Sequence, residues 1–176
     1  MSRAYEMLAR ILEVHPRAAA WSTEIAGFKG RLLWQTYQRT GAASDLRAAR
    51  DTYTEALEVN TDSHYMADNV GQLSLLLDEK DVARQAFSKG LEALNRTGDR
   101  GYWALATRAS CHLGLGQTAE GLAALRQITM LEPEPAIFDS IRRGLRRLHK
   151  GLGGTPEQLE VWLAALEGGE AERPTH

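Results

Sequence analysis

The chain has 176 residues, 43% hydrophobic and 25% charged, so it is long enough for one domain with a substantial core and too short to suggest two. No apolar run approaches the roughly 20 residues that span a bilayer, so no membrane partner is expected. The formal net charge of −2 provides no overall attraction to nucleic acid, which argues against a nucleic-acid partner. Cys111 is the only cysteine, which excludes an internal disulfide and, with no visible secretion signal, favours the cytoplasm.

The first predicted element is an amphipathic helix within residues 1–16. Apolar residues recur at helical spacing from Tyr5 to Val14, and His15 and Pro16 end the pattern. Two interpretations stay open for this segment: an orphan helix cut from a longer protein, or a cap on the helices that follow.

Three helix pairs are predicted next, at residues 22–61, 64–97 and 102–133. Their second helices share one pattern, in which a small residue is followed four positions later by a large one. The pattern occurs as Ala49 with Tyr53, as Ala83 with Phe87, and as Gly121 with Leu125. Because one pair cannot bury its apolar face alone, such units stack on their neighbours.

Turns between the paired helices are expected near Gly41, between Asp78 and Asp81, and near Gly116. No segment alternates cleanly between apolar and polar residues, so no sheet is expected. The first two units are 34 residues apart, which is the tetratricopeptide period. The predicted fold is therefore all-α: a tetratricopeptide-like right-handed superhelix of about three to four helix pairs with capping helices.

Two C-terminal helices, at residues 134–150 and 156–167, are predicted to form a capping pair. The first carries an apolar stripe that runs from Ile137 to Leu148. The second begins with a capping-box sequence, residues 155–158, that has proline at the first helical position. A single domain over residues 1–167 follows, and residues 168–176 are predicted to be a disordered tail.

No catalytic residue, metal ligand or cofactor is predicted. The five histidines are scattered, and the single cysteine, Cys111, has the setting of a small core residue. Gly114-Leu115-Gly116 lacks a preceding strand and a following Gly-Lys-Ser/Thr, so it is an inter-helix turn and not a phosphate loop. The chain is therefore not expected to be an enzyme.

A candidate recognition surface follows from the first helices of the units, which would face a concave groove. Counting from the turns places Phe28, Tyr65 and Trp103 at equivalent positions, either as packing between layers or as a stacking wall for a ligand. Polar residues near them suit hydrogen-bonded recognition: Arg31, Gln35, Asp68, Asn69, Gln72, Thr107 and Ser110.

A second candidate is the basic stretch at residues 142–150. Arg143 and Arg147 are four residues apart on one helix, so they project together and could hold a phosphate or carboxylate. The alternative is that this stretch is a solvated face.

The sequence also resembles a known family over about residues 22–150. Residues 24–32 are similar to its Glu-x-x-Gly-x-x-Gly-Arg element, and residues 102–107 to its Tyr-Trp-x-x-Ala-Thr element. Trp34 and Gln35 stand where that family usually has lysine and aspartate. The family is the TRAF-binding regulatory region of the apoptosis signal-regulating kinases and its bacterial relatives, called TPR-S.

The resemblance implies a regulatory domain of a signalling or prokaryotic conflict system. It assigns recognition, and no catalysis, to Arg31, Tyr65, Asn69, Trp103 and Thr107. Two functions stay open: an interaction or scaffolding module with a protein or peptide partner, and a sensor that binds a nucleotide-derived anionic small molecule in the concave groove.

Overall fold

The computed structural model describes residues 3–15 and 22–168, and all regular secondary structure in these ranges is helical. The helices are α1 (Arg3–Val14), α3 (Thr23–Thr40), α4 (Ala43–Val59), α5 (His64–Leu76), α6 (Lys80–Thr97), α7 (Tyr102–Gly114), α8 (Thr118–Thr129), α9 (Pro135–Leu152) and α10 (Pro156–Leu166). The all-α prediction is confirmed for this part of the chain. None of the described helices is both long and apolar enough to cross a membrane.

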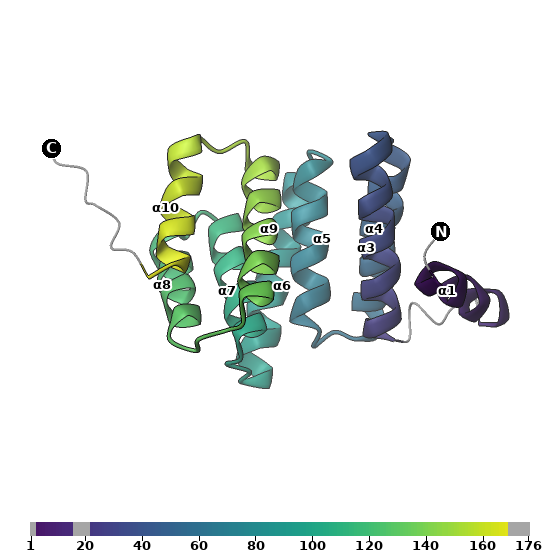
Figure 1. The fold of residues 1–176 in the computed structure, drawn as a ribbon, viewed down its shortest axis with the longest axis horizontal. Coiled ribbons are helices and arrows are strands. Elements are labelled where there is room, and N and C mark those ends of the chain that lie inside the picture. Colours follow the sequence, from purple (N-terminus) through teal and green to yellow (C-terminus); the bar gives the residue numbers. More distant parts are fainter. Residues whose placement is uncertain (1–2, 16–21, 169–176) are drawn as a thin grey trace, which may run out of the picture.

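Three helix pairs, α3 with α4, α5 with α6 and α7 with α8, form the body of the fold (Figure 1). The turns within the pairs contain Gly41, Asp78 and Gly116, which have positive φ angles of 71°, 60° and 78°. Glycine adopts this conformation without steric cost, and aspartate is one of the few other residues that tolerate it. The predicted turn positions are confirmed.

In the first two pairs, an aromatic ring of the second helix lies against a glycine of the first. Tyr53 of α4 packs on Gly30 of α3, and Phe87 of α6 packs on Gly71 of α5. A Cβ atom at either glycine would overlap the ring, so these positions let the paired helices approach closely.

The third pair reverses this arrangement, because the large side chain comes from the first helix. Leu113 of α7 packs on Gly121 of α8, where a Cβ atom would lie only 2.6 Å from the Leu113 side chain. The predicted large positions are nevertheless all in the core: Tyr53, Phe87 and Leu125 are at most 1% exposed.

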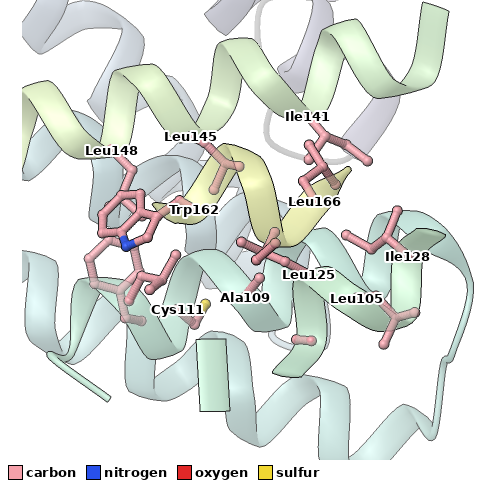
Figure 2. Packing of buried hydrophobic residues seen from close by; sticks show 14 of the residues in the cluster. Leu105, Ala109, Cys111, Leu125, Ile128, Ile141, Leu145, Leu148, Trp162 and Leu166 are labelled. Atoms are coloured by element: carbon pink, nitrogen blue, oxygen red, sulfur yellow. The ribbon is translucent and has the colours of Figure 1, made fainter. Parts of the chain in front are cut away.

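Two apolar clusters form the core. One lies between α3, α4 and the inner side of α5, and the other extends from α5 and α6 through α10. Figure 2 shows the second cluster, in which Ile141 and Leu148 of α9 point towards Leu166 and Trp162 of α10. Helix α5 contributes to both clusters, through Leu73 to the first and Leu75 to the second.

The two C-terminal helices pack on the helix pairs as well as on each other. Helix α10 packs on α8 and α9, whereas α9 packs on α5 and α7, which belong to different pairs. At the end of α9, a Cβ atom at Gly151 would lie 2.8 Å from the Cβ atom of Leu75, so α9 and α5 approach closely there. The predicted capping box is present at the start of α10, between Thr155 and Gln158.

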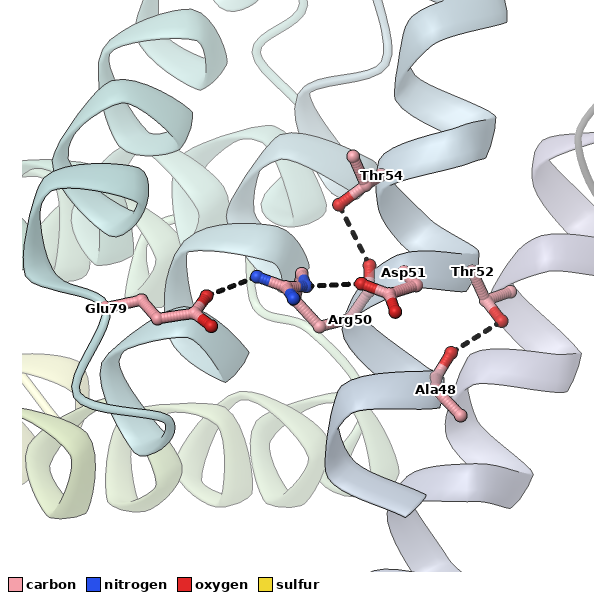
Figure 3. A network of polar contacts seen from close by, with 6 residues as sticks. All are labelled: Ala48, Arg50, Asp51, Thr52, Thr54 and Glu79. Carbon is pink, nitrogen blue, oxygen red and sulfur yellow. Dashed lines mark hydrogen bonds and ion pairs between the residues drawn. The ribbon is translucent and has the colours of Figure 1, made fainter. Parts of the chain in front are cut away.

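A polar contact also joins the first two pairs (Figure 3). Arg50 of α4 forms ion pairs with Asp51 and with Glu79, the residue that precedes α6. Both Arg50 and Glu79 are partly shielded from solvent, with side chains 18% and 33% exposed. The contact therefore fixes α4 against the turn between α5 and α6.

The predicted N-terminal helix is present as α1, which lies beyond α3 and α4 at one end of the molecule (Figure 1). Its apolar residues Met7, Ile11 and Val14 are 59%, 36% and 71% exposed. The end of the predicted segment, at Pro16, and the predicted tail beyond Gly168 lie outside the described residues.

Candidate functional site

A buried polar network lies between α5 and α7. Gln72 donates hydrogen bonds to both carboxylate oxygens of Asp68, at 3.0 and 2.9 Å, and to the Ser110 hydroxyl at 2.9 Å. The Ser110 hydroxyl in turn donates to Asp68. These three side chains are at most 9% exposed, so the network is part of the interior.

Arg147 of α9 joins this network through hydrogen bonds to α5. Its Nε donates to Oε1 of Gln72 at 2.7 Å, and its Nη2 donates to Oδ1 of Asn69 at 2.9 Å. The guanidinium carbon also lies 5.5 Å from the centre of the Trp34 ring, a cation–π contact. One side chain therefore connects α9, α5 and α3.

The buried carboxyl group of Asp68 has a perturbed acidity. Burial raises its pKa above the usual range, and this effect outweighs the hydrogen bonds from Ser110 and Gln72 and the nearby positive charge of Arg147, which lower the pKa. The folded chain therefore holds a proton at Asp68 more tightly than the unfolded chain does.

This difference predicts a pH dependence of stability that the Asp68→Asn variant should lack. As pH rises from about 4 through the raised pKa of Asp68, the free energy of unfolding of the native chain should fall relative to that of the variant. Each unit of pKa difference corresponds to about 1.4 kcal/mol. Urea unfolding of both proteins across this range measures the effect. A native chain that instead gains stability relative to the variant would show that Arg147 lowers the pKa of Asp68 more than burial raises it.

The predicted recognition residues fall into two groups, one buried and one exposed to solvent. Asp68, Asn69, Gln72, Thr107 and Ser110 are at most 9% exposed, because α9 lies over the helices that carry them. The predicted concave groove is therefore filled along α5 and α7.

The second group is open to solvent. Tyr65 and Trp103 are 44% and 48% exposed, and Arg31, Gln35 and Arg143 are also exposed. Arg147, predicted to project together with Arg143, instead points into the fold.

The predicted register of the three aromatic residues also changes. Tyr65 lies six residues before Gly71, the glycine that faces the ring of Phe87, but Phe28 lies only two residues before Gly30, the corresponding glycine of α3. Phe28 therefore lies about one helical turn further along α3 than Tyr65 lies along α5. The guanidinium carbon of Arg31 is 5.9 Å from the centre of the Phe28 ring. Tyr65 and Trp103 remain in register, because each is the second residue of its helix, α5 and α7.

A shallow polar cavity of about 510 Å³ lies where the loop before α5 meets the end of α6. His64 and Asp99 approach to 3.6 Å in its wall, which also contains the hydroxyl side chains of Thr61, Ser63 and Thr97. Burial raises the pKa of the Cys111 thiol, which disfavours the reactive thiolate. Within the described ranges, no group of three or more histidine, cysteine or acidic residues is arranged to hold a metal ion.

Comparison of the chain with known proteins finds no matching family model, no matching curated protein and no matching solved structure. The functional assignment therefore depends on the arrangement of the exposed residues themselves.

Proposed function

We propose that the chain is a tetratricopeptide-like interaction module without enzymatic activity, and that its helix pairs follow a right-handed superhelix. The proposal is supported by the 34-residue period and by the repeated packing of a large side chain on a small residue between paired helices. The resemblance to the TRAF-binding regulatory regions and TPR-S domains favours a regulatory role in a signalling or prokaryotic conflict system.

The observation that carries this proposal is the exposure of Tyr65 and Trp103. They occupy equivalent positions on α5 and α7, and neither is needed to fill the core. Trp103 also packs edge-on against Tyr102, with 5.4 Å between the ring centres, which limits its motion. Large, immobilised and exposed aromatic side chains are typical of the residues that dominate the binding energy of protein interfaces.

The Trp103→Ala variant tests this function. It should lose most of its affinity for the protein partner, an effect of about 2 kcal/mol or more at an interface centre, while the melting temperature changes little. Partners are first identified by affinity purification from the source cells with the native chain as bait. Each purified candidate is then titrated against both proteins by calorimetry. A partner that binds the variant as tightly as the native chain would place the interface elsewhere.

A second candidate function is a sensor for a nucleotide-derived anionic small molecule. The observation that favours it is the pair of exposed arginines, Arg31 and Arg143, which have no ion-pair partner among the described residues. A thermal-shift screen with nucleotides separates the two functions, because a ligand at about 100 times its dissociation constant adds about 2.7 kcal/mol to stability. The interaction module should show no such shift.

A further inference from the structure

Three parallel helices, α3, α5 and α9, carry Arg31, Tyr65 and Arg143 within about one helical turn of one another. Helix α9 runs parallel to α5, because Arg147 contacts Asn69 and Gln72 while Gly151, one turn later, meets Leu75. Helix α3 is also parallel to α5, because each is antiparallel to α4, which lies between them in the chain.

The hydrogen bond between Arg147 and Asn69 shows which residues of α9 and α5 lie side by side. One turn towards the N-terminus from Asn69 and Arg147, α5 and α9 carry Tyr65 and Arg143. On α3, Arg31 lies one turn after Gly27, which faces the Tyr65 ring, and the Arg31 guanidinium carbon lies 5.9 Å from the centre of the Phe28 ring. Both arginines therefore lie within about one helical turn of Tyr65.

The ring of Tyr65 packs against residues of α4 and α3. It packs edge-on against Tyr53, with ring centres 6.2 Å apart and an interplanar angle of 88°. It also rests on α3, where a Cβ atom at Gly27 would lie 3.2 Å from the ring. The exposed part of the ring is thus a fixed apolar surface between two helices that carry arginine.

The exposed side of α9 extends the positive charge. The helix contains five basic residues and one acidic residue, Asp139, which is paired with Arg142. Arg143, Arg146 and Lys150 are exposed, lie at helical spacing on the outer face, and have no ion-pair partner among the described residues. We call Arg31, Arg143, Arg146 and Lys150 the basic strip.

We propose that the basic strip and Tyr65 bind an acidic peptide segment of the protein partner, with a carboxylate held between Arg31 and Arg143. This inference rests on the proposed interaction function. Arginine presents a planar fork that fits a carboxylate, and the Tyr65 ring accommodates the apolar stem of the same side chain. Because Arg147 anchors α9 to α5 and α3, Arg143 is positioned before the partner arrives, which lowers the cost of binding.

The length of the strip favours a peptide over nucleic acid. From Arg143 to Lys150, α9 rises by about 11 Å, which suits a few carboxylates and is short for the many phosphate contacts that give nucleic acids their affinity. The chain as a whole carries a net charge of −2, which would repel an extended polyanion beyond the strip.

The test measures the fluorescence anisotropy of a short fluorescein-labelled peptide rich in glutamate and containing one leucine. Arg31→Glu and Arg143→Glu should each weaken binding by about tenfold or more, and affinity should fall with added salt. The matched control is Arg126→Glu, an exposed arginine of α8 outside the strip, which should change the dissociation constant by less than about twofold. Circular dichroism melting curves confirm that each variant is folded.

Several results would overturn the inference. They are no binding of the peptide at low salt, equal losses in the control and strip variants, and tighter binding of a single-stranded oligonucleotide or of ATP than of the peptide. These results leave the Trp103→Ala experiment unaffected. A partner that depends on Trp103 but not on Arg31 or Arg143 would therefore support the interaction module and refute the acidic segment.

Discussion

Replacing Phe87 with alanine should lower the free energy of unfolding by about 3–5 kcal/mol. The Phe87 side chain is fully buried, and its two edges lie against Gly71 of α5 and Gly114 of α7. Neither glycine has a side chain that could move into the space left by the ring, so the cavity should remain open. Urea unfolding followed by circular dichroism measures the loss.

The matched control for this prediction is Trp103→Ala, which removes a larger aromatic side chain from an exposed position. Because Trp103 is 48% exposed, its loss should cost well under the effect of Phe87→Ala. If the two variants were destabilised equally, Phe87 would not be the ring that joins α5, α6 and α7.

The helices and turns could be predicted from the sequence because their signals are local. The pattern of Ala83 and Phe87 repeats in the neighbouring units, and Gly41 and Gly116 mark turns that need a positive φ angle. Each signal spans a few residues and depends on backbone geometry or on the helical period alone.

The position of α9 could not be predicted in this way. Its apolar stripe predicts an amphipathic helix, but the stripe would look the same whichever surface it covers. The contacts that decide the matter join Arg147 to Gln72 and Asn69, 75 and 78 residues apart in the chain. No local pattern contains such a pairing, so the burial of the predicted recognition residues on α5 could not be foreseen.

The exposed part of the candidate site was easier to identify. Their positions on the predicted helices place Tyr65, Trp103 and Arg31 towards a groove, and all three are open to solvent. Tyr65 and Trp103 remain exposed because α9 covers a different stretch of α5 and α7, and Arg31 lies on α3. The role of Trp34 was missed. The guanidinium group of Arg147 lies over the Trp34 ring. The sequence offers one local indication of this role: Trp34 stands where the family that the chain resembles usually has a charged residue.

The contribution of Arg147 leads to the second large prediction, that Arg147→Met should lower the free energy of unfolding by about 2–4 kcal/mol. Methionine retains an apolar stem that can rest on Trp34, so the variant removes chiefly the charge and the two hydrogen bonds. Oxygen atoms of Asn69 and Gln72 would lose their donors in a site that is at most 3% exposed. The neighbouring exposed residue supplies a control, since Arg146→Met should change stability by no more than about 0.5 kcal/mol.

A double-mutant cycle with Asp68→Asn separates two reasons for this loss. If Arg147 stabilises the fold mainly by offsetting the buried carboxylate, Arg147→Met should cost less in the Asp68→Asn background, with a coupling of about 0.5–3 kcal/mol that shrinks as Asp68 is protonated at low pH. If the hydrogen bonds to Asn69 and Gln72 account for the loss, the cost should be the same in both backgrounds and at every pH. Equal stability of Arg147→Met and the native chain would contradict both, and would mean that α9 is held on α5 by its apolar stripe alone.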